Sequence, residues 1–337
     1  MELTTIWFAL IAVLWIGYFC LEGFDFGVGM LLPVLAKNDT ERRVLINTVG
    51  PVWDGNEVWL LVAGGATFAA FPEWYATLFS GFYLPLLLIL LALIVRGLAF
   101  EYRAKRDNAQ WRARWDLALI IGSFVPALLW GVAFANILRG VPIDADLEYV
   151  GGFFNLLNPY ALLGGLMTLL LFATHGAVFI SLKTDGRIRH EARRLATMIG
   201  LGAAAVTVAF LLWTQIDTGT VASGIAFVLA AVALVGGLLA NRIGREGWAF
   251  IGTFVAIALG VAGLFLGLFP DVMPTSLADG TSLTTTNASA TDYTLKIMTV
   301  TAVIFTPLVL AYQSWTYWVF RRRLSVDHIP VAITADQ

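Results

Sequence analysis

Long apolar segments constrain this chain more than any other feature of its sequence. A helix needs about 20 mostly apolar residues to cross a bilayer, and segments of this length recur along the whole chain. Of the 337 residues, 59% are hydrophobic and 13% are charged, whereas a soluble domain carries about 25% charged residues. We therefore expect an all-α integral membrane protein. Its nine predicted transmembrane helices lie at residues 6–35, 49–71, 75–100, 115–138, 158–182, 194–216, 222–241, 247–269 and 296–320.

The distribution of basic residues predicts the orientation of these helices. Lys and Arg gather in the segments that follow the odd-numbered helices, and acidic residues prevail in the other loops. Because cytoplasmic loops carry the excess of Lys and Arg, we predict an outside N-terminus and a cytoplasmic C-terminus. A soluble helical core would show no such alternation. The basic residues concerned are Lys37, Arg42, Arg43, Arg103, Lys105, Arg106, Arg112, Arg114, Lys183, Arg187, Arg189, Arg193, Arg194, Arg242, Arg245, Arg321, Arg322 and Arg323.

The start of the chain and its cysteine content set two further limits. No Lys or Arg precedes the first apolar segment, so we interpret it as a retained helix and not as a cleaved signal peptide. Cys20 is the only cysteine of the sequence. An internal disulfide and a metal site built from several cysteines are therefore excluded.

A faint internal repeat indicates two similar units. "GMLLPVLAKND" at 29–39 is similar to "HGAVFISLKTD" at 175–185, and both pass from a helix end into a basic loop. We interpret this as two parallel four-helix units, with chance similarity between basic loops as the alternative. The predicted parts are a first unit (1–138), a second unit (139–269), an outside loop (270–295) and a ninth helix with a cytoplasmic tail (296–337).

Four carboxylates inside the predicted spans are the most informative residues. Glu22 and Asp25 belong to the first span, and Asp54 and Glu57 belong to the second. An unpaired charge at the bilayer centre costs at least about 2.5–3.5 kcal/mol. The i, i+3 spacing within each pair places both acids on one helix face. At 1.5 Å per residue, Asp54, Glu57, Asp25 and Glu22 lie roughly 7, 12, 15 and 20 Å from the cytoplasmic edge, a ladder that resembles a proton path.

Structural roles are the alternatives for each acid. Asp54 would lie in the first turn of a helix that begins near Pro51, where the helix dipole favours a negative charge. Glu22 and Glu57 could pair with groups on another helix. Asp25 could make a polar contact with a partner subunit.

Arg96 and His175 are two further ionisable residues within the predicted spans. Arg96 is expected to reach the cytoplasmic surface by snorkelling, with a buried counter-ion for the acids as the alternative. A bis-histidine haem needs two histidines on facing membrane helices, and His175 is the only one of three within a span. We expect a satisfied polar contact for His175 in preference to a His–Met haem site. Trp74, Tyr75, Trp315, Tyr317 and Trp318 are interpreted as interfacial anchors.

Five longer motifs run through the chain. They are "LEGFDFGVGML" (21–31), the segment 38–72 that contains "WDGNEVW", "GSFVPALLWGVAFANILRGVP" (122–142), "NPYALLGGL" (158–166) and "YTLKIMT" (293–299). Together these motifs resemble subunit II of cytochrome bd quinol:oxygen oxidase, and the resemblance covers nearly the whole chain.

The resemblance implies a subunit of a bacterial terminal oxidase in the cytoplasmic membrane. Such a complex oxidises a quinol, reduces dioxygen to water and takes its chemical protons from the cytoplasm. It implies a heterodimer in which the partner, subunit I, holds two b-type haems and one d-type haem, and this chain alone binds no cofactor or metal. The family also allows a structural quinone, bound phospholipid and small single-helix accessory subunits. No nucleic acid is expected as a partner.

The same resemblance assigns roles to residues of the motif. Asp54 matches an acid of the family's proton path toward the partner's haems, and Trp59 matches a residue beside a lipid-side oxygen entrance. Trp53 and Asn56 are expected to support the motif, and Asp25 has a supporting or interface role. No catalytic residue is expected in this chain. The expected path consists of Asp54, Asp25, Glu57 and Glu22.

Two other functions compete with the oxidase. A proton-coupled membrane transporter would fit the repeat and the buried acids, but transporters of this kind show broken helices in both halves. Here only the first half has acids within its spans. A purely structural scaffold is the third reading, and it predicts that neutralising Asp54 leaves turnover intact.

Overall fold

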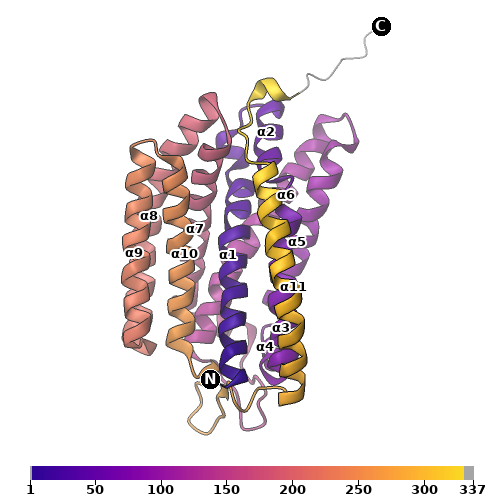
Figure 1. Ribbon diagram of the computed structural model, residues 1–337. Helices are drawn as coiled ribbons and strands as arrows, with labels where there is room; N and C mark the ends of the chain where they lie inside the picture. The colour runs from indigo at the N-terminus through magenta and orange to yellow at the C-terminus, as the bar shows by residue number, and fades with distance from the viewer. Residues whose placement is uncertain (1, 330–337) are drawn as a thin grey trace.

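The computed structural model describes residues 2–329 and consists mainly of long helices (Figure 1). The far end of the predicted cytoplasmic tail, residues 330–337, lies outside this described part. The elements are α1 (Leu3–Leu35), α2 (Asp39–Val49), α3 (Trp53–Ala70), α4 (Pro72–Gly81), α5 (Tyr83–Tyr102), η1 (Arg103–Lys105), α6 (Ala109–Arg139), η2 (Phe153–Leu156), α7 (Pro159–Lys183), α8 (Gly186–Thr218), α9 (Val221–Arg242), α10 (Glu246–Leu268), β1 (Asp271–Met273), β2 (Leu283–Thr284), α11 (Asp292–Val319) and η3 (Val326–His328).

The long helices stand side by side and alternate in direction (Figure 1). α2 and the end of α11 lie at one end of the bundle, together with the basic connecting segments, and we call it the basic end. The N-terminus, α4 and the two short strands lie at the opposite end. α1 is central, since it packs against α3, α6, α7 and α10.

Eight helices are long and apolar enough to cross a membrane, among the residues that the structure describes. They are α1, α5, α6, α7, α8, α9, α10 and α11. The predicted span 49–71 contains α3, which falls outside this set since Asp54, Asn56 and Glu57 make its first turns polar. The prediction of a mostly helical membrane protein is therefore confirmed.

The predicted span 75–100 is wrong at its start. The structure divides this region into α4, which ends at Gly81, and α5, which begins at Tyr83. Pro85 explains the break, because its ring would clash with the carbonyl of Gly81 in a continuous helix. In the first turn of α5 the same proline needs no backbone donor.

Glycines on α1 allow its close contact with α7. A Cβ atom at Gly27 would collide with the carbonyl oxygen of Phe172, and it would lie 2.6 Å from the Cα of Gly176. The two backbones therefore touch directly, as small residues in membrane helices permit.

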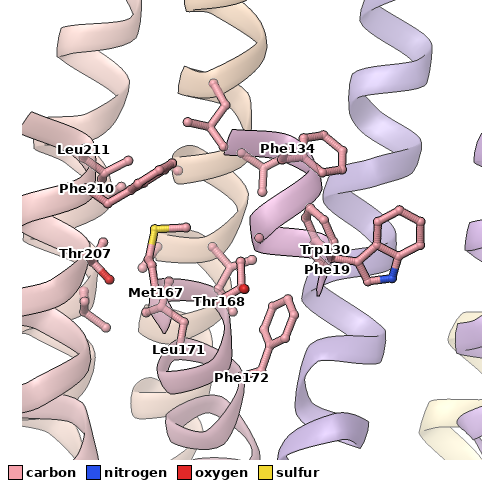
Figure 2. A pocket seen from close by; sticks show the side chains of 18 residues that line it. Phe19, Trp130, Phe134, Met167, Thr168, Leu171, Phe172, Thr207, Phe210 and Leu211 are labelled. Atoms are coloured by element: carbon pink, nitrogen blue, oxygen red, sulfur yellow. The ribbon is translucent and has the colours of Figure 1, made fainter. Parts of the chain in front are cut away.

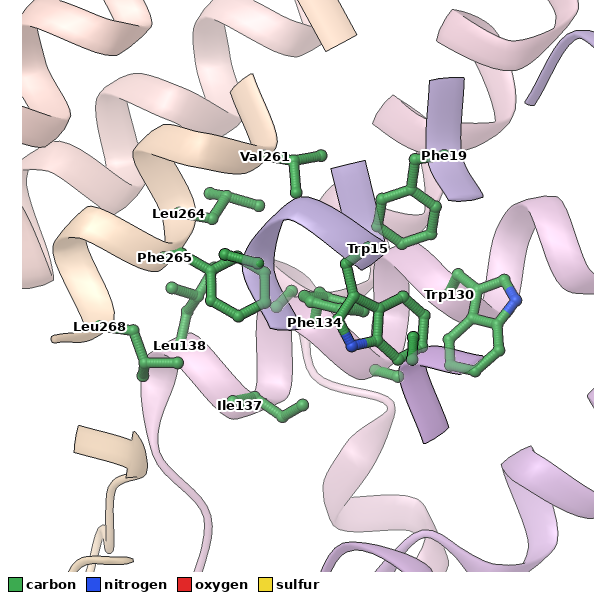
Figure 3. Packing of buried hydrophobic residues seen from close by; sticks show 14 of the residues in the cluster. Trp15, Phe19, Trp130, Phe134, Ile137, Leu138, Val261, Leu264, Phe265 and Leu268 are labelled. Carbon is green, nitrogen blue, oxygen red and sulfur yellow. The ribbon is translucent and has the colours of Figure 1, made fainter. Parts of the chain in front are cut away.

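An aromatic cluster fills the core between α1, α6 and α10 (Figure 3). The ring centroid of Trp15 lies 4.9 Å from those of both Trp130 and Phe134, in edge-to-face geometry. The indole nitrogen of Trp130 donates to the hydroxyl of Tyr18 over 3.1 Å. Such pairs add about 0.5–1.5 kcal/mol each beyond the burial of their area. This packing holds α1 rigidly below the polar residues that follow on the same helix.

Candidate functional site

A group of polar side chains is buried where α1, α3 and α5 meet. We call it the buried polar cluster; it consists of Glu22, Asp25, Asn56, Glu57 and Arg96. The side chains of Glu22 and Arg96 are fully buried, and that of Glu57 is 20% exposed. Three carboxylates thus share one guanidinium inside an apolar bundle. An arrangement that costs this much desolvation indicates a function.

Arg96 occupies the centre of this cluster, so the predicted snorkelling is wrong. Its Nη1 donates to Glu22 Oε1, and the same nitrogen lies 3.8 Å from Glu57 Oε2. The guanidinium also lies 4.8 Å from the ring centroid of Phe26 and 5.4 Å from that of Phe100. Carboxylates from two other helices compensate the charge here, which removes the reason for the side chain to reach the surface.

Asn56 joins three helices through both ends of its amide. Its nitrogen donates to Asp25 Oδ2 on α1 over 2.7 Å. Its oxygen accepts from the hydroxyl of Tyr317 at 2.7 Å and from the amide of Gln313 at 3.2 Å, both on α11. Gln313 in turn accepts from the indole nitrogen of Trp59 over 2.8 Å. Asn56 and Trp59 therefore hold α11 against α3.

The interfacial belt prediction is wrong for two of its residues. Trp74 is buried at 3% exposure, and Tyr317 points inward to Asn56. Trp315 and Trp318 are exposed on α11, as expected for anchors. Sequence analysis missed the inward role of Gln313 and Tyr317, although their i, i+4 spacing places them on one face of α11.

Asp54 lies outside the buried polar cluster, on the exposed surface of the chain. It sits in the first turn of α3, where the helix dipole favours its charge. The neighbouring Trp53 stacks on Phe100 with ring centroids 4.8 Å apart. The structure therefore brings Glu22, Asp25 and Glu57 together and leaves Asp54 on the outer face of the same helix.

Several atoms of the cluster have unused hydrogen-bonding capacity. Within the described residues, Glu22 Oε2, Asp25 Oδ1 and the Nε and Nη2 atoms of Arg96 are buried without a hydrogen-bond partner. Leaving such an atom unsatisfied costs about 1–3 kcal/mol. Atoms of this kind are the positions where internal water binds, and carboxylates beside water can exchange protons.

His175 makes the satisfied polar contact that its sequence context predicts. Its Nδ1 lies 2.7 Å from the hydroxyl of Thr253, and its Nε2 lies 3.1 Å from the carbonyl oxygen of Cys20. The ring stacks on Phe250 at 4.7 Å. Because both nitrogens are engaged, His175 does not fit the role of a haem ligand. Residues 2–329 contain no group of three or more His, Cys, Asp or Glu side chains placed to hold a metal ion.

Two apolar cavities differ in their relation to the site. One of about 40 Å³ lies between Phe19 on α1, Trp130 on α6, Met167 on α7 and Phe210 on α8 (Figure 2). A larger one of about 470 Å³ lies among α3, α4, α5 and α6 and includes Leu60, next to Trp59. The apolar walls of this larger cavity offer a place for a small apolar molecule.

Acids at the basic end are paired and thus differ from the cluster. Glu41 lies 2.5 Å from Arg187 and also accepts from the backbone N–H of Lys37. Partial burial acts to raise the pKa of Glu41, but these contacts outweigh it and hold that pKa below its ordinary value. Asp116 accepts from Arg103 over 2.5 Å. These pairs fasten the connecting segments and are not part of the site.

The fold and the site define a multi-spanning helical membrane protein with an ion cluster buried in its first half. Residues 3–320 match the family described as cytochrome bd terminal oxidase subunit II. The chain belongs to this family, as its motifs predict. It is therefore a subunit of a terminal oxidase and a multi-pass protein of the bacterial cytoplasmic membrane.

Relatives and a solved structure agree with this assignment. The chain is 46% identical to cytochrome bd ubiquinol oxidase subunit 2 of Bacillus subtilis (strain 168), over 96% of this chain and 97% of the relative. It is 37% identical to cytochrome bd-I ubiquinol oxidase subunit 2 of Escherichia coli (strain K12), over 96% of each. The structure of bd oxidase from Geobacillus thermodenitrificans contains a chain with a TM-score of 0.78 and 16% identity, covering 95% of this chain and 99% of that one. At this identity the match shows the fold alone.

Proposed function

We propose that this chain is the haem-free subunit of a heterodimeric quinol:dioxygen oxidoreductase that reduces dioxygen to water. The partner, subunit I, carries the b-type and d-type haems in this proposal. The relatives named as ubiquinol oxidase subunits support it. So does His175, the sole histidine within the predicted spans, whose ring nitrogens are both engaged. A structural quinone, phospholipid and single-helix accessory subunits complete the proposed complex.

In this proposal α3 also crosses the membrane and brings the number of transmembrane helices to nine. The N-terminus is outside and the C-terminus is cytoplasmic. With 18 residues, α3 is about 27 Å long at 1.5 Å per residue, close to the roughly 30 Å of hydrocarbon. Asn56 and Glu57 in its first turns belong to the buried polar cluster, which lowers their cost in the membrane. The two four-helix units, 1–138 and 139–269, are supported by the direct contact of α1 with α7 at Gly27 and Gly176.

The proposed proton path begins at Asp54 and continues through Glu57 to Glu22 and Asp25. The observation that carries it is the buried cluster of three carboxylates around Arg96. A single guanidinium cannot neutralise three ionised carboxylates, and carboxyl groups that share one counter-charge are suited to pass a proton among themselves. Asp54 lies on a face of α3 that is otherwise apolar and exposed, with Val58 and Leu61. An acid on such a face needs a partner subunit against it.

The proposed oxygen entrance consists of Trp59 and the apolar cavity that its sequence neighbour Leu60 lines. Dioxygen is apolar and concentrates in hydrocarbon, and this cavity is lined by Leu60, Leu61 and Phe68 with few polar atoms. Trp59 is half-buried one residue before Leu60, and its indole nitrogen donates to Gln313. A rigid aromatic ring at this position would shape the passage from lipid.

The replacement Asp54→Asn tests the path. We expect oxygen consumption by the assembled complex to fall about tenfold or more, because the side chain no longer carries a proton. The haem absorption spectrum should stay unchanged. Asp107→Asn is the matched control, since Asp107 is an exposed acid at the same end. Normal oxygen consumption in the Asp54 variant would show a structural role and end the proposal for the path.

A proton-coupled transporter is the second candidate, favoured by the buried carboxylates alone. Proteoliposomes that contain only this chain would then accumulate a solute in response to a pH gradient. The oxidase proposal expects no such transport, and it expects a haem-bearing partner to co-purify in equal amount. Strong haem absorbance from the isolated chain would contradict it.

A further inference from the structure

A pocket with a basic rim lies at the basic end, beside the end of α11. Its volume is about 430 Å³. Val52, Phe179 and Phe250 form apolar walls, contributed by the start of α3, by α7 and by α10. Lys183, Arg321 and Arg322 line the same pocket. We call it the basic pocket; one side of it is apolar and the other is cationic.

The position of α11 explains why this pocket exists. α11 packs mainly against α1 and α3, and the segment after it is hydrogen-bonded to the end of α7. There the N–H of Leu324 donates to the carbonyl oxygen of Lys183 over 2.8 Å, and Lys183 Nζ donates to the carbonyl oxygens of Phe320 and Arg322. The segment after α11 thus connects the end of α11 to the end of α7.

The charge of the pocket is only partly balanced. Arg323 lies 3.5 Å from Asp185 and 3.8 Å from Glu246. Within residues 2–329 no carboxylate lies at ion-pair distance from Arg321 or Arg322, and none lines the pocket. Arg321 Nη1 donates to the carbonyl oxygen of Trp318, and its guanidinium lies 4.4 Å from the centroid of that ring. Its other nitrogens and the Arg322 guanidinium remain for an external anion. Arg binds phosphate oxygens through two parallel hydrogen bonds.

The depth of the pocket matches the lipid headgroup region. Trp315 and Trp318 are exposed on the last turns of α11, at the level where Trp residues favour the membrane interface. We propose that the basic pocket binds an anionic phospholipid of the phosphatidylglycerol class. Its phosphate contacts Arg321 and Arg322, and an acyl chain lies against Phe179 and Phe250. Basic pockets between transmembrane helices on the cytoplasmic side favour such lipids.

This lipid would also stabilise a contact of the buried polar cluster. Tyr317 lines the pocket and donates to Asn56. A headgroup held beside Tyr317 would keep the end of α11 in place. Lipid binding itself does not depend on the proposed proton path.

Native mass spectrometry of the delipidated whole complex tests the site. Phosphatidylglycerol and phosphatidylcholine with the same acyl chains are titrated separately. For the double variant R321Q/R322Q we expect phosphatidylglycerol affinity to fall roughly tenfold or more, because two charges near the headgroup are lost. Phosphatidylcholine should bind weakly throughout. R321K/R322K should retain most of the binding.

The matched control is R106Q/R114Q, which removes two exposed arginines at the same end but outside the pocket. It should leave phosphatidylglycerol binding unchanged, and an unaltered haem spectrum confirms that each variant is assembled. Equal loss in the control would mean general surface attraction and would overturn the proposal. Equal binding of both lipids would overturn it too. So would binding that inorganic phosphate at millimolar concentration abolishes, since a soluble anion would then be the ligand.

Discussion

The two halves of the bundle solve the same packing problem with different side chains. In the first half, α1, α3 and α5 enclose Glu22, Asp25, Glu57 and Arg96. In the second half, α7 to α10 enclose apolar residues, hydroxyl groups and the engaged His175, and their buried acid Glu246 lies at the basic end and pairs with Arg189. α1 and α7 pack against each other through Gly27 and Gly176. This helix contact between the halves is made without buried charge. The difference indicates that the charge of the first half is retained for function.

The largest effect is expected from Arg96→Met. This change leaves Glu22 and Glu57 buried beside each other without a counter-charge, a loss of about 3–5 kcal/mol. We expect little assembled complex, measured as haem content of purified membranes. The double variant R96M/E22L should recover part of it, because the uncompensated carboxylate is also removed. Equal yields of Arg96→Met and the surface variant R114Q would mean that the ion pair is not structural.

A large effect on activity is expected from Asp25→Asn. The amide keeps a similar size and can still bond Asn56 after rotation, so assembly should be retained. Oxygen consumption should fall about tenfold or more if this carboxylate carries protons. The Asn56→Asp variant sharpens the result, since it places two acids 2.7 Å apart and should shift the pH profile of turnover. An unchanged rate in Asp25→Asn would restrict the path to Glu22 and Glu57.

A moderate effect on stability, without an effect on haem, is expected in the second half. His175→Leu removes the hydrogen bonds to the Thr253 hydroxyl and the Cys20 carbonyl, each worth about 0.5–1.5 kcal/mol. Thermal unfolding of the complex should shift downward, whereas His175→Gln should retain much of the stability. Haem content per complex should stay the same in both. Loss of one haem in His175→Gln would contradict the purely structural role assigned to His175 in the second half.

The smallest effect is expected at the basic end. The pKa of Glu41 lies below its ordinary value, so its contact with Arg187 contributes stability at pH values above the unfolded pKa of about 4.3. That contribution is lost as the pH falls through the lower pKa of the folded state. Glu41→Gln should therefore make the free energy of unfolding less dependent on pH below about pH 5. The change should be about 1 kcal/mol or less. A difference at pH 7 that exceeds the one expected for Arg96→Met would reverse the order of importance.

Sequence reasoning located the charged residues but not their partners. Glu22, Asp25, Asp54 and Glu57 stand out because charge in an apolar segment is visible without a structure. Arg96 was equally visible, but snorkelling and burial differ only in which helices surround it. Pro85 indicates the break between α4 and α5, but the continuous apolar segment from 75 to 100 favoured a single helix.

The sequence by itself determined that the chain is a helical membrane protein of this family, since apolar length, loop charge and extended motifs are local properties. Only the tertiary structure decided that Arg96 is the shared counter-ion, that Asn56 joins α1 to α11, and that Asp54 stays on the outer face. These contacts connect residues 31 to 261 positions apart. The physical reason is that the desolvation and pairing of a buried charge depend on the helices around it, and neighbouring helices in a bundle are set by packing and not by order in the chain.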